Sequence, residues 1–290
     1  MSETPVSGTE TQPLSIPSRV PYLDYGGQGK TIHFAHANGY NPGCYRQLAS
    51  YLVADYHVLG MALRPLWPDS KPAGLQRWRD MVPDLFAFFE QHRLPRLIGA
   101  GHSLGSVLTL MAALAQPERF ERLILIDPVV QSPSFLAQFW TADGQSTGAD
   151  HPLAQIARRR RDHWPDRATA FAHLRPKPIF AGLSDEALAD YLEMGLRPDG
   201  DEVTLAFSRE WEAWIYQHDP HEIWSLLPQV QPPMLIIYAE HSGIITAETV
   251  ARIRDLRPQT ELIMLPNCGH LLPMEQPAAV AGIMLDWLKD

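Results

Sequence analysis

The chain has 290 residues, of which 45% are hydrophobic and 20% are charged, so it can form one large domain or a core with an insertion. Its formal net charge of −9 disfavours binding to nucleic acid or to an anionic membrane, because both would repel an acidic surface. Two cysteines, Cys44 and Cys268, lie far apart in the sequence and imply no disulfide framework. No apolar run approaches the roughly 20 residues of a membrane helix. We therefore expect a cytoplasmic protein that binds neither nucleic acid nor a membrane.

The N-terminal segment, residues 1–20, is rich in serine, threonine, proline and glutamate. It lacks the basic start and the apolar centre of a signal peptide, so we expect a flexible tail. Short apolar runs then predict strands at 31–36, 56–61, 97–100, 123–126, 234–238 and 261–265. Longer amphipathic runs predict helices at 45–54, 75–92, 106–114 and 278–289, and Pro83 can kink the second of these. Uniformly apolar strands joined by helices predict a parallel sheet covered on both faces.

The stretch from 131 to 229 interrupts this alternation. It contains no clear buried strand, is rich in aromatic residues and carries the arginine run 158–161. We expect a mostly helical insertion over the C-terminal edge of the sheet, between the core segments 21–130 and 230–290. Its aromatic residues fit a core role better than a pocket role, and the arginine run is typical of a solvated helix face.

A serine turn joins the apolar run 97–100 to the helical run 106–114. The sequence of Gly101–Gly105 is G-H-S-L-G. Glycines on both sides of the serine let strand and helix approach closely at a sharp, strained turn. Such a turn exposes a hydroxyl at a helix N-terminus, where backbone N–H groups can stabilise an oxyanion. The context favours Ser103 as a nucleophile, and the alternative is a helix N-cap serine.

A histidine follows the last expected strand. His270 lies in a loop where the sequence continues as x-x-P-x-E-x-P. A loop in this place can hold an imidazole above the serine turn, and a serine hydroxyl needs a neighbouring base to take its proton. We therefore predict that His270 is the base and that His102 packs beside the nucleophile. His218 and His221 have the spacing of a metal pair but no evident third ligand, so we predict no metal site.

Together these motifs resemble those of the α/β-hydrolase family, in its serine-nucleophile branch. The resemblance covers 20–290 and is strongest at Gly101–Gly105, at His36–Gly39 and at Asn267–His270. It implies a mostly parallel, doubly wound sheet, with a helical cap inserted after the sixth core strand. It also implies that no metal or organic cofactor is needed.

The resemblance further implies two backbone donors for an oxyanion. One is the N–H of Leu104, which follows the nucleophile, and the other is that of Asn38, in a loop where relatives carry His-Gly-x and this chain carries His-Ala-Asn. Tyr40, Arg64 and Trp67 belong to loops at the same edge of the sheet and could border a substrate pocket. A packed loop explains these three residues equally well.

The acid is the point at which the sequence departs from the family. Relatives carry an aspartate in the loop after the strand 234–238, but Ser242 occupies that place here. Losing this buried carboxylate can cost about 10⁴ in turnover. Asp127, at the end of an earlier core strand, and Glu240, two residues before Ser242, both keep the family order of serine, acid and histidine. We favour Asp127, because some relatives take their acid from this strand end; His241 is a weaker alternative, as a hydrogen-bond partner only.

The function implied is that of a serine hydrolase acting on an ester-type bond of a small, apolar substrate through an acyl-enzyme intermediate. Ser103 would attack the acyl carbon, His270 would take its proton, and Asp127 or Glu240 would hold the imidazole. Thioester, lactone and carbon–carbon bond cleavage, and acyl transfer to another alcohol, would use the same residues. A different hypothesis, prompted by the missing aspartate, is a non-catalytic protein that binds a small ligand in the same pocket.

Overall fold

The computed structural model describes residues 16–141, 147–148, 150–218 and 222–289. Most of the tail expected at 1–20 lies outside these ranges. Its last residue, Val20, is buried, and Val20 N donates to Gln91 Oε1 at 2.7 Å. The end of the predicted tail is therefore anchored to the core, just before the first strand. No helix in the described ranges is long and apolar enough to cross a membrane.

The central sheet has seven strands among the described residues, in the order β1-β3-β2-β4-β5-β9-β10. They are β1 (Tyr22–Gly26), β2 (Thr31–Ala35), β3 (His57–Met61), β4 (Leu97–His102), β5 (Phe120–Ile126), β9 (Met234–Ala239) and β10 (Glu261–Leu265). All neighbours are parallel except β1 and β3, so the predicted, mostly parallel sheet is confirmed. The prediction missed β1, because this edge strand contains no buried residue and no apolar run.

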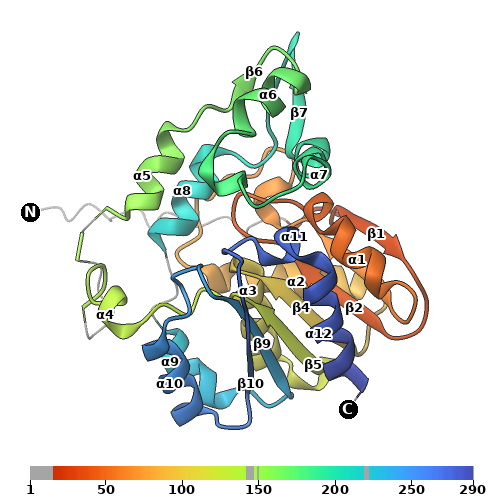
Figure 1. Cartoon of the computed structure of the whole chain (residues 1–290), viewed down its shortest axis with the longest axis vertical. Coiled ribbons are helices and arrows are strands. Elements are labelled where there is room, and N and C mark those ends of the chain that lie inside the picture. Colours follow the sequence, from red (N-terminus) through yellow and green to blue (C-terminus); the bar gives the residue numbers. More distant parts are fainter. Residues whose placement is uncertain (1–15, 142–146, 149, 219–221, 290) are drawn as a thin grey trace, which may run out of the picture.

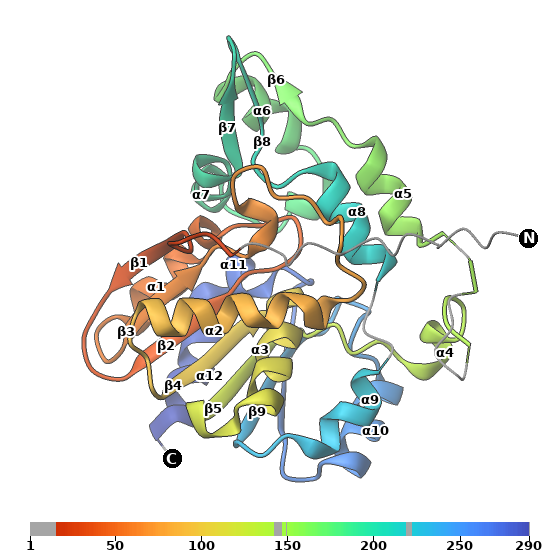
Figure 2. The same ribbon diagram turned by 180° about the vertical axis from the view of Figure 1, so that it is seen from behind.

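Helices cover both faces of the sheet (Figures 1 and 2). On one face lie α2 (Val82–Gln91), α3 (Leu104–Ala115) and α10 (Ala247–Leu256), and on the other lie α1 (Arg46–Leu52), α11 (Leu272–Glu275) and α12 (Pro277–Lys289). Residues of β5 alternate between the two apolar layers, with Leu123 and Leu125 in the first and Ile124 and Ile126 in the second. Burial on both faces explains why the strands are apolar throughout.

The helix predicted at 75–92 is shorter than expected. A 3₁₀ turn, Trp78–Met81, precedes α2, and Pro83 lies in the first turn of α2 without kinking it. Proline fits this position because the N–H that it lacks would have no partner within the helix there.

The chain leaves the sheet after β5 and returns to it at β9. The family resemblance counts β5 as the sixth core strand, but it is the fifth of the seven described strands. Between β5 and β9 lie α4 (Pro133–Leu136), α5 (Pro152–Arg159), α6 (Arg167–Leu174), α7 (Asp185–Gly195), α8 (Arg209–Gln217) and α9 (Ile223–Leu226). Helices α5 to α8 are grouped at one edge of the sheet, whereas α9 lies beside α10 (Figures 1 and 2).

The insertion also contains a small antiparallel sheet, which the expectation of a mostly helical segment did not include. Its strands are β6 (His163–Trp164), β8 (Glu202–Leu205) and β7 (Leu196–Asp199), in that order. They have two to four residues each, and many of their positions are exposed. No apolar run therefore marks these strands in the sequence.

Two glycines let α3 cross β4 and β2 at close range. A Cβ on Gly105 would lie 2.1 Å from Ala35 O, and a Cβ on Gly101 would lie 2.4 Å from Gly105 C. Both distances are far below van der Waals contact, and the atoms concerned belong to the backbone. Only glycine therefore fits at these two positions without a shift of the helix or the sheet.

Gly105→Ala is expected to lower the free energy of unfolding by about 1–3 kcal/mol, because the added methyl group overlaps backbone that can move only with the sheet. Thermal and urea unfolding measure the change. Gly282→Ala in α12 is the matched control: its Cβ would meet no atom within 4 Å, and alanine favours a helix more than glycine does. The control should be at least as stable as the parent protein, and equal destabilisation by both substitutions would contradict the packing argument.

Candidate active site

Ser103 lies in the turn between β4 and α3, with φ 55° and ψ −116°. A positive φ is strained for a residue with a side chain, and such strain persists only where the surroundings hold it. Here Ser103 N donates to Ile126 O at 2.9 Å, and Ser106 Oγ donates to Gly101 O at 2.6 Å. These bonds hold the backbone of the turn, and the Ser103 side chain lines a cavity at the N-terminal end of α3.

A buried carboxylate and an imidazole meet close to this turn. Asp127 follows β5 and is 0% exposed, and its Oδ2 accepts a hydrogen bond from His270 Nδ1 at 2.6 Å. Its Oδ1 accepts hydrogen bonds from Ser242 Oγ at 3.1 Å and from Ala239 N at 3.3 Å. Because Nδ1 carries the proton in this arrangement, Nε2 of a neutral His270 is an acceptor. Ser242, at the position where the family resemblance implies an aspartate, thus donates to the carboxylate of Asp127.

Glu240, the other candidate acid, has different partners. Its Oε2 accepts a hydrogen bond from Asn267 N at 2.9 Å and lies 3.6 Å from His241 Nε2. The side chain of Glu240 is 39% exposed and that of His241 is 63% exposed. Neither of these described residues is bonded to His270, so the structure brings Asp127 to the imidazole and leaves Glu240 and His241 at the surface.

The loop after β2 carries Asn38 and is braced by a buried histidine. His36 Nδ1 donates to Ala37 O at 2.8 Å, and His36 Nε2 accepts from Leu63 N at 3.0 Å. Burial lowers the pKa of His36 to about 4, so the ring is neutral at pH 7. Neither Asn38 N nor Leu104 N donates to another described residue, which leaves both N–H groups available to an oxygen atom in the cavity.

His102 links this loop to the loop of His270. His102 Nε2 donates to His270 O at 2.8 Å, and His102 Nδ1 accepts from Tyr45 Oη at 2.9 Å. Tyr45 Oη in turn accepts from Ala37 N at 3.0 Å. Burial, assisted by the neighbouring His270, lowers the pKa of His102 well below its usual value, so the ring stays neutral and these directions hold. One chain of hydrogen bonds therefore joins three loops of the site.

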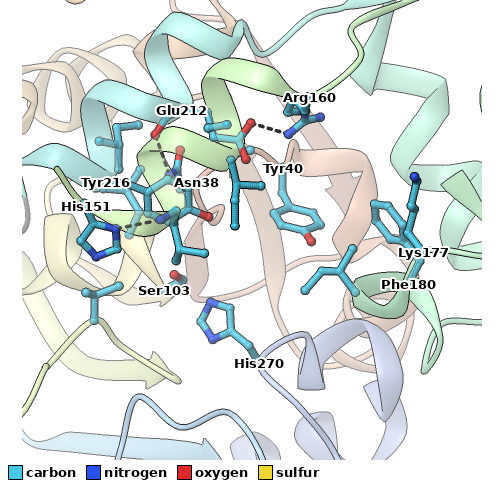
Figure 3. Close-up of a pocket in the computed structure, with 18 of the residues that line it drawn as sticks. Asn38, Tyr40, Ser103, His151, Arg160, Lys177, Phe180, Glu212, Tyr216 and His270 are labelled. Carbon is cyan, nitrogen blue, oxygen red and sulfur yellow. Dashed lines mark hydrogen bonds and ion pairs between the residues drawn. The ribbon is translucent and has the colours of Figure 1, made fainter.

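A cavity of about 830 Å³ opens over these groups. Ser103, Leu104, Asn38 and His270 line it, together with other core residues such as Tyr40 and Trp78 and with residues of the insertion. Figure 3 shows Ser103 and His270 on one side of the group of lining side chains and Glu212 and Arg160 of the insertion on the other. Figure 3 shows the ring of His270 beside the side chain of Ser103. No hydrogen bond joins these two described residues, and such bonds are often loose until a ligand is bound.

The residues expected to border the pocket divide into two groups. Tyr40 lines the cavity, but Arg64 and Trp67 do not. Arg64 is buried in an ion pair in which its Nε donates to Asp84 Oδ2 at 2.8 Å. The guanidinium carbon of Arg64 lies over the ring of Trp67, 4.9 Å from the ring centre, and Trp67 Nε1 donates to Ala62 O at 2.8 Å. Both side chains thus pack the loop after β3, which is the alternative that the sequence left open.

Several lining residues were not assigned to the pocket from the sequence. Among them are His151, Arg160, Phe180, Tyr191, Glu212 and Tyr216. Helix α8 is tied to the core, because Asn38 Nδ2 donates to Glu212 O at 3.3 Å and Trp78 Nε1 donates to Ile215 O at 3.0 Å. The sequence signals were the abundance of aromatic residues in 131–229, which does not tell which rings face a cavity, and the arginine run 158–161. The interpretation of this run as a solvated helix face is wrong for Arg160, which lies beyond the end of α5, forms an ion pair with Glu212 and lines the cavity.

The described residues contain no group of three or more side chains that could hold a metal ion. Of the segment 218–221, residues 219–221 lie outside the described ranges, and His218 Nδ1 donates to Trp214 O at 2.7 Å. The chemistry that the described site offers is that of a hydroxyl, an imidazole and a carboxylate.

A sequence profile described as "Alpha/beta hydrolase family" matches residues 34–283. The chain belongs to the alpha/beta hydrolase family. This alpha/beta hydrolase is 24% identical to probable esterase D14L of Oryza sativa subsp. japonica, over 89% of this chain and 92% of that protein. It is 31% identical to karrikin insensitive 2 receptor IA of Petunia hybrida, over 37% of this chain and 39% of that protein. The solved structure of E-2-(acetamidomethylene)succinate hydrolase shares the fold, with a TM-score of 0.79, 18% identity and coverage of 93% of this chain and 94% of that one.

Buried histidines make the stability of this alpha/beta hydrolase sensitive to acid. Burial lowers the pKa of His33 to about 3, that of His36 to about 4 and that of His102 well below 6.5. In the unfolded chain each titrates near 6.5, so below this pH the unfolded state binds more protons and is favoured. From about pH 6 to about pH 4 we expect His33 and His36 each to lower the free energy of unfolding by roughly 1.4 kcal/mol per pH unit, and His102 to act in the same direction.

Urea unfolding as a function of pH, compared between variants, measures this effect. Neither ring nitrogen of His33 has a hydrogen-bond partner among the described residues, so His33→Leu should reduce the acid sensitivity without removing a bond. His241→Gln, at an exposed position, is the control and should leave the pH dependence unchanged. The same acid sensitivity in His33→Leu as in the parent protein would contradict the assignment.

Proposed function

We propose that the protein is a serine hydrolase that cleaves an ester-type acyl bond of a small molecule through an acyl-enzyme intermediate. The observation that carries the proposal is the 2.6 Å hydrogen bond from His270 to the buried Asp127, with the imidazole beside the strained Ser103 (Figure 3). A hydroxyl, an imidazole and a carboxylate in this order form the arrangement that activates a serine. Membership of a hydrolase family supports the same reading.

In the first proposed step, Ser103 Oγ attacks the carbonyl carbon while His270 Nε2 takes its proton. The imidazolium that forms is stabilised by the carboxylate of Asp127. The carbonyl oxygen becomes an oxyanion and accepts hydrogen bonds from Asn38 N and Leu104 N, at the positive end of α3. Each such donor is typically worth about 10²–10³ in kcat. His270 then gives the proton to the leaving group, and the acyl group remains on Ser103.

In the second proposed step, a water molecule gives a proton to His270 and attacks the acyl carbon. The tetrahedral intermediate again places its oxyanion on the two backbone donors. Its collapse returns the proton to Ser103 Oγ and releases the acid. Asp127 serves both steps in the same way, because it keeps the proton of the neutral imidazole on Nδ1 and leaves Nε2 facing the hydroxyl or the water.

A second candidate is a ligand-binding protein that uses the cavity without turning its ligand over. One relative is named as a receptor, karrikin insensitive 2 receptor IA, and this similarity favours the candidate. Thioester, lactone or carbon–carbon bond cleavage, and acyl transfer to another alcohol, would need the same side chains as ester hydrolysis. The hydrolase and the ligand-binding protein differ in one property that can be measured, which is the reactivity of Ser103.

A fluorophosphonate probe is expected to label Ser103 in the folded protein, because attack at phosphorus uses the same base and the same oxyanion donors. Mass spectrometry of peptides identifies the labelled residue. Ser103→Ala should abolish labelling, whereas Ser50→Ala, at an exposed position of α1, should not change it. Unlabelled Ser103 in protein that unfolds at the normal temperature would contradict a catalytic serine and favour the ligand-binding candidate.

A further inference from the structure

The cavity is cationic although the protein is acidic. Among the described residues that line it are the cations Arg159, Arg160, Arg161 and Lys177, against one carboxylate, that of Glu212. The whole chain has the opposite balance, with 24 Lys and Arg against 33 Asp and Glu. A cleft lined by one sign of charge focuses its field and raises the local concentration of ligands with the other sign. The lining therefore favours an anionic ligand.

Two of the four cations, Arg160 and Arg161, already bind other groups of the protein. Arg160 forms an ion pair with Glu212, and its Nη2 donates to Tyr191 Oη at 3.2 Å. Arg161 Nε donates to His163 O at 2.7 Å. These contacts hold both guanidinium groups in place and neutralise the one carboxylate of the described lining.

The other two cations, Arg159 and Lys177, are exposed, and their side chains form neither a hydrogen bond nor an ion pair with another described residue, whereas the guanidinium of Arg161 is held by a backbone carbonyl. Arg159 is the last residue of α5, and Lys177 precedes the 3₁₀ turn Pro178–Phe180, so they reach the cavity from separate segments. Figure 3 shows Lys177 beside Phe180, at the edge of the group of lining side chains. The neighbouring Arg158 does not line the cavity, and its Nη1 lies 3.5 Å from Asp150 Oδ1.

Three large aliphatic residues of the cavity lining are exposed, and we call the part of the lining that they form with Arg159 and Lys177 the mouth of the cavity. Leu153, Ile156 and Ile179 line it although they are 45%, 63% and 53% exposed. Ile156 lies one helical turn before Arg159 on α5, and Ile179 lies two residues after Lys177. Exposed aliphatic residues gathered at one opening indicate a binding surface, whereas single ones do not. The mouth thus combines exposed aliphatic side chains with positive charge that has no carboxylate partner among the described residues.

We propose that the substrate is an acyl compound with an aliphatic chain and a terminal anionic group, such as a carboxylate, which Arg159 and Lys177 bind while the scissile carbonyl lies at Ser103. This inference rests on the proposed function and names its substrate class. The chain packs against the aliphatic side chains of the mouth, and the anion accepts charge-assisted hydrogen bonds from the two cations. Because both cations are exposed to solvent, each is expected to contribute about threefold to kcat/KM, and the two together about tenfold.

The test compares two esters that differ by one charge: 4-nitrophenyl hydrogen suberate, which is anionic, and its neutral methyl ester. Release of nitrophenolate gives kcat/KM for each, after the uncatalysed rate is subtracted. The wild-type protein is expected to prefer the anionic ester by about tenfold, Arg159→Gln and Lys177→Gln should each reduce this preference about threefold, and the double variant should abolish it. Added salt should also reduce the preference, since the charges are exposed.

Arg158→Gln is the matched control, because it removes the same charge one position earlier on α5, outside the cavity. Its preference for the anionic ester should equal that of the wild type. Equal rates with both esters in the wild type, or the same loss in Arg158→Gln as in Arg159→Gln, would overturn this inference and leave the proposed hydrolase intact. Hydrolysis of neither ester, together with unlabelled Ser103, would overturn the proposed function itself.

Discussion

The site depends on the burial of one carboxylate, that of Asp127. A fully buried carboxylate is costly unless donors satisfy both of its oxygens, and here the donors are His270, Ser242 and the backbone of Ala239. These groups belong to the ends of β5 and β9 and to the loop that follows β10. Burial of the carboxylate therefore fixes three separate segments relative to one another, and with them the position and the tautomer of the imidazole.

A second set of buried polar groups holds the other side of the site. The hydrogen bonds from Ala37 to Tyr45, from Tyr45 to His102 and from His102 to His270 join the loop after β2, the serine turn and the loop of the imidazole. In the proposed mechanism these three segments supply an oxyanion donor, the nucleophile and the base. Catalysis of this kind is sensitive to displacements of the reacting groups by about 1 Å. In the proposed mechanism the network therefore positions these groups, in addition to stabilising the fold.

The parallel sheet was predictable because strands buried on both faces are apolar throughout. Strands β1 and β6 to β8 were not, since their exposed positions leave no such run. The predicted nucleophile, base, acid and oxyanion donors lie at one edge because the C-terminal ends of parallel strands converge there, although their roles remain proposals. Arg64 and Trp67 also follow a strand at that edge. Arg64 forms an ion pair with the buried Asp84, however, so its side chain packs within the loop and does not line the cavity. The hydrogen bond from Ser242 to Asp127, and the choice of insertion residues that line the cavity, depend on tertiary packing, which residue spacing does not encode.

The most direct test of whether Asp127 supports His270 is the turnover of a short-chain nitrophenyl ester by Asp127→Asn and Glu240→Gln. Asparagine keeps the shape of the carboxylate but not its charge or its control of the tautomer, so Asp127→Asn is expected to lower kcat by about 10⁴. Glu240→Gln retains an acceptor for Asn267 N and should leave kcat close to that of the wild type. Loss of activity in Glu240→Gln, with Asp127→Asn as active as the wild type, would contradict the account.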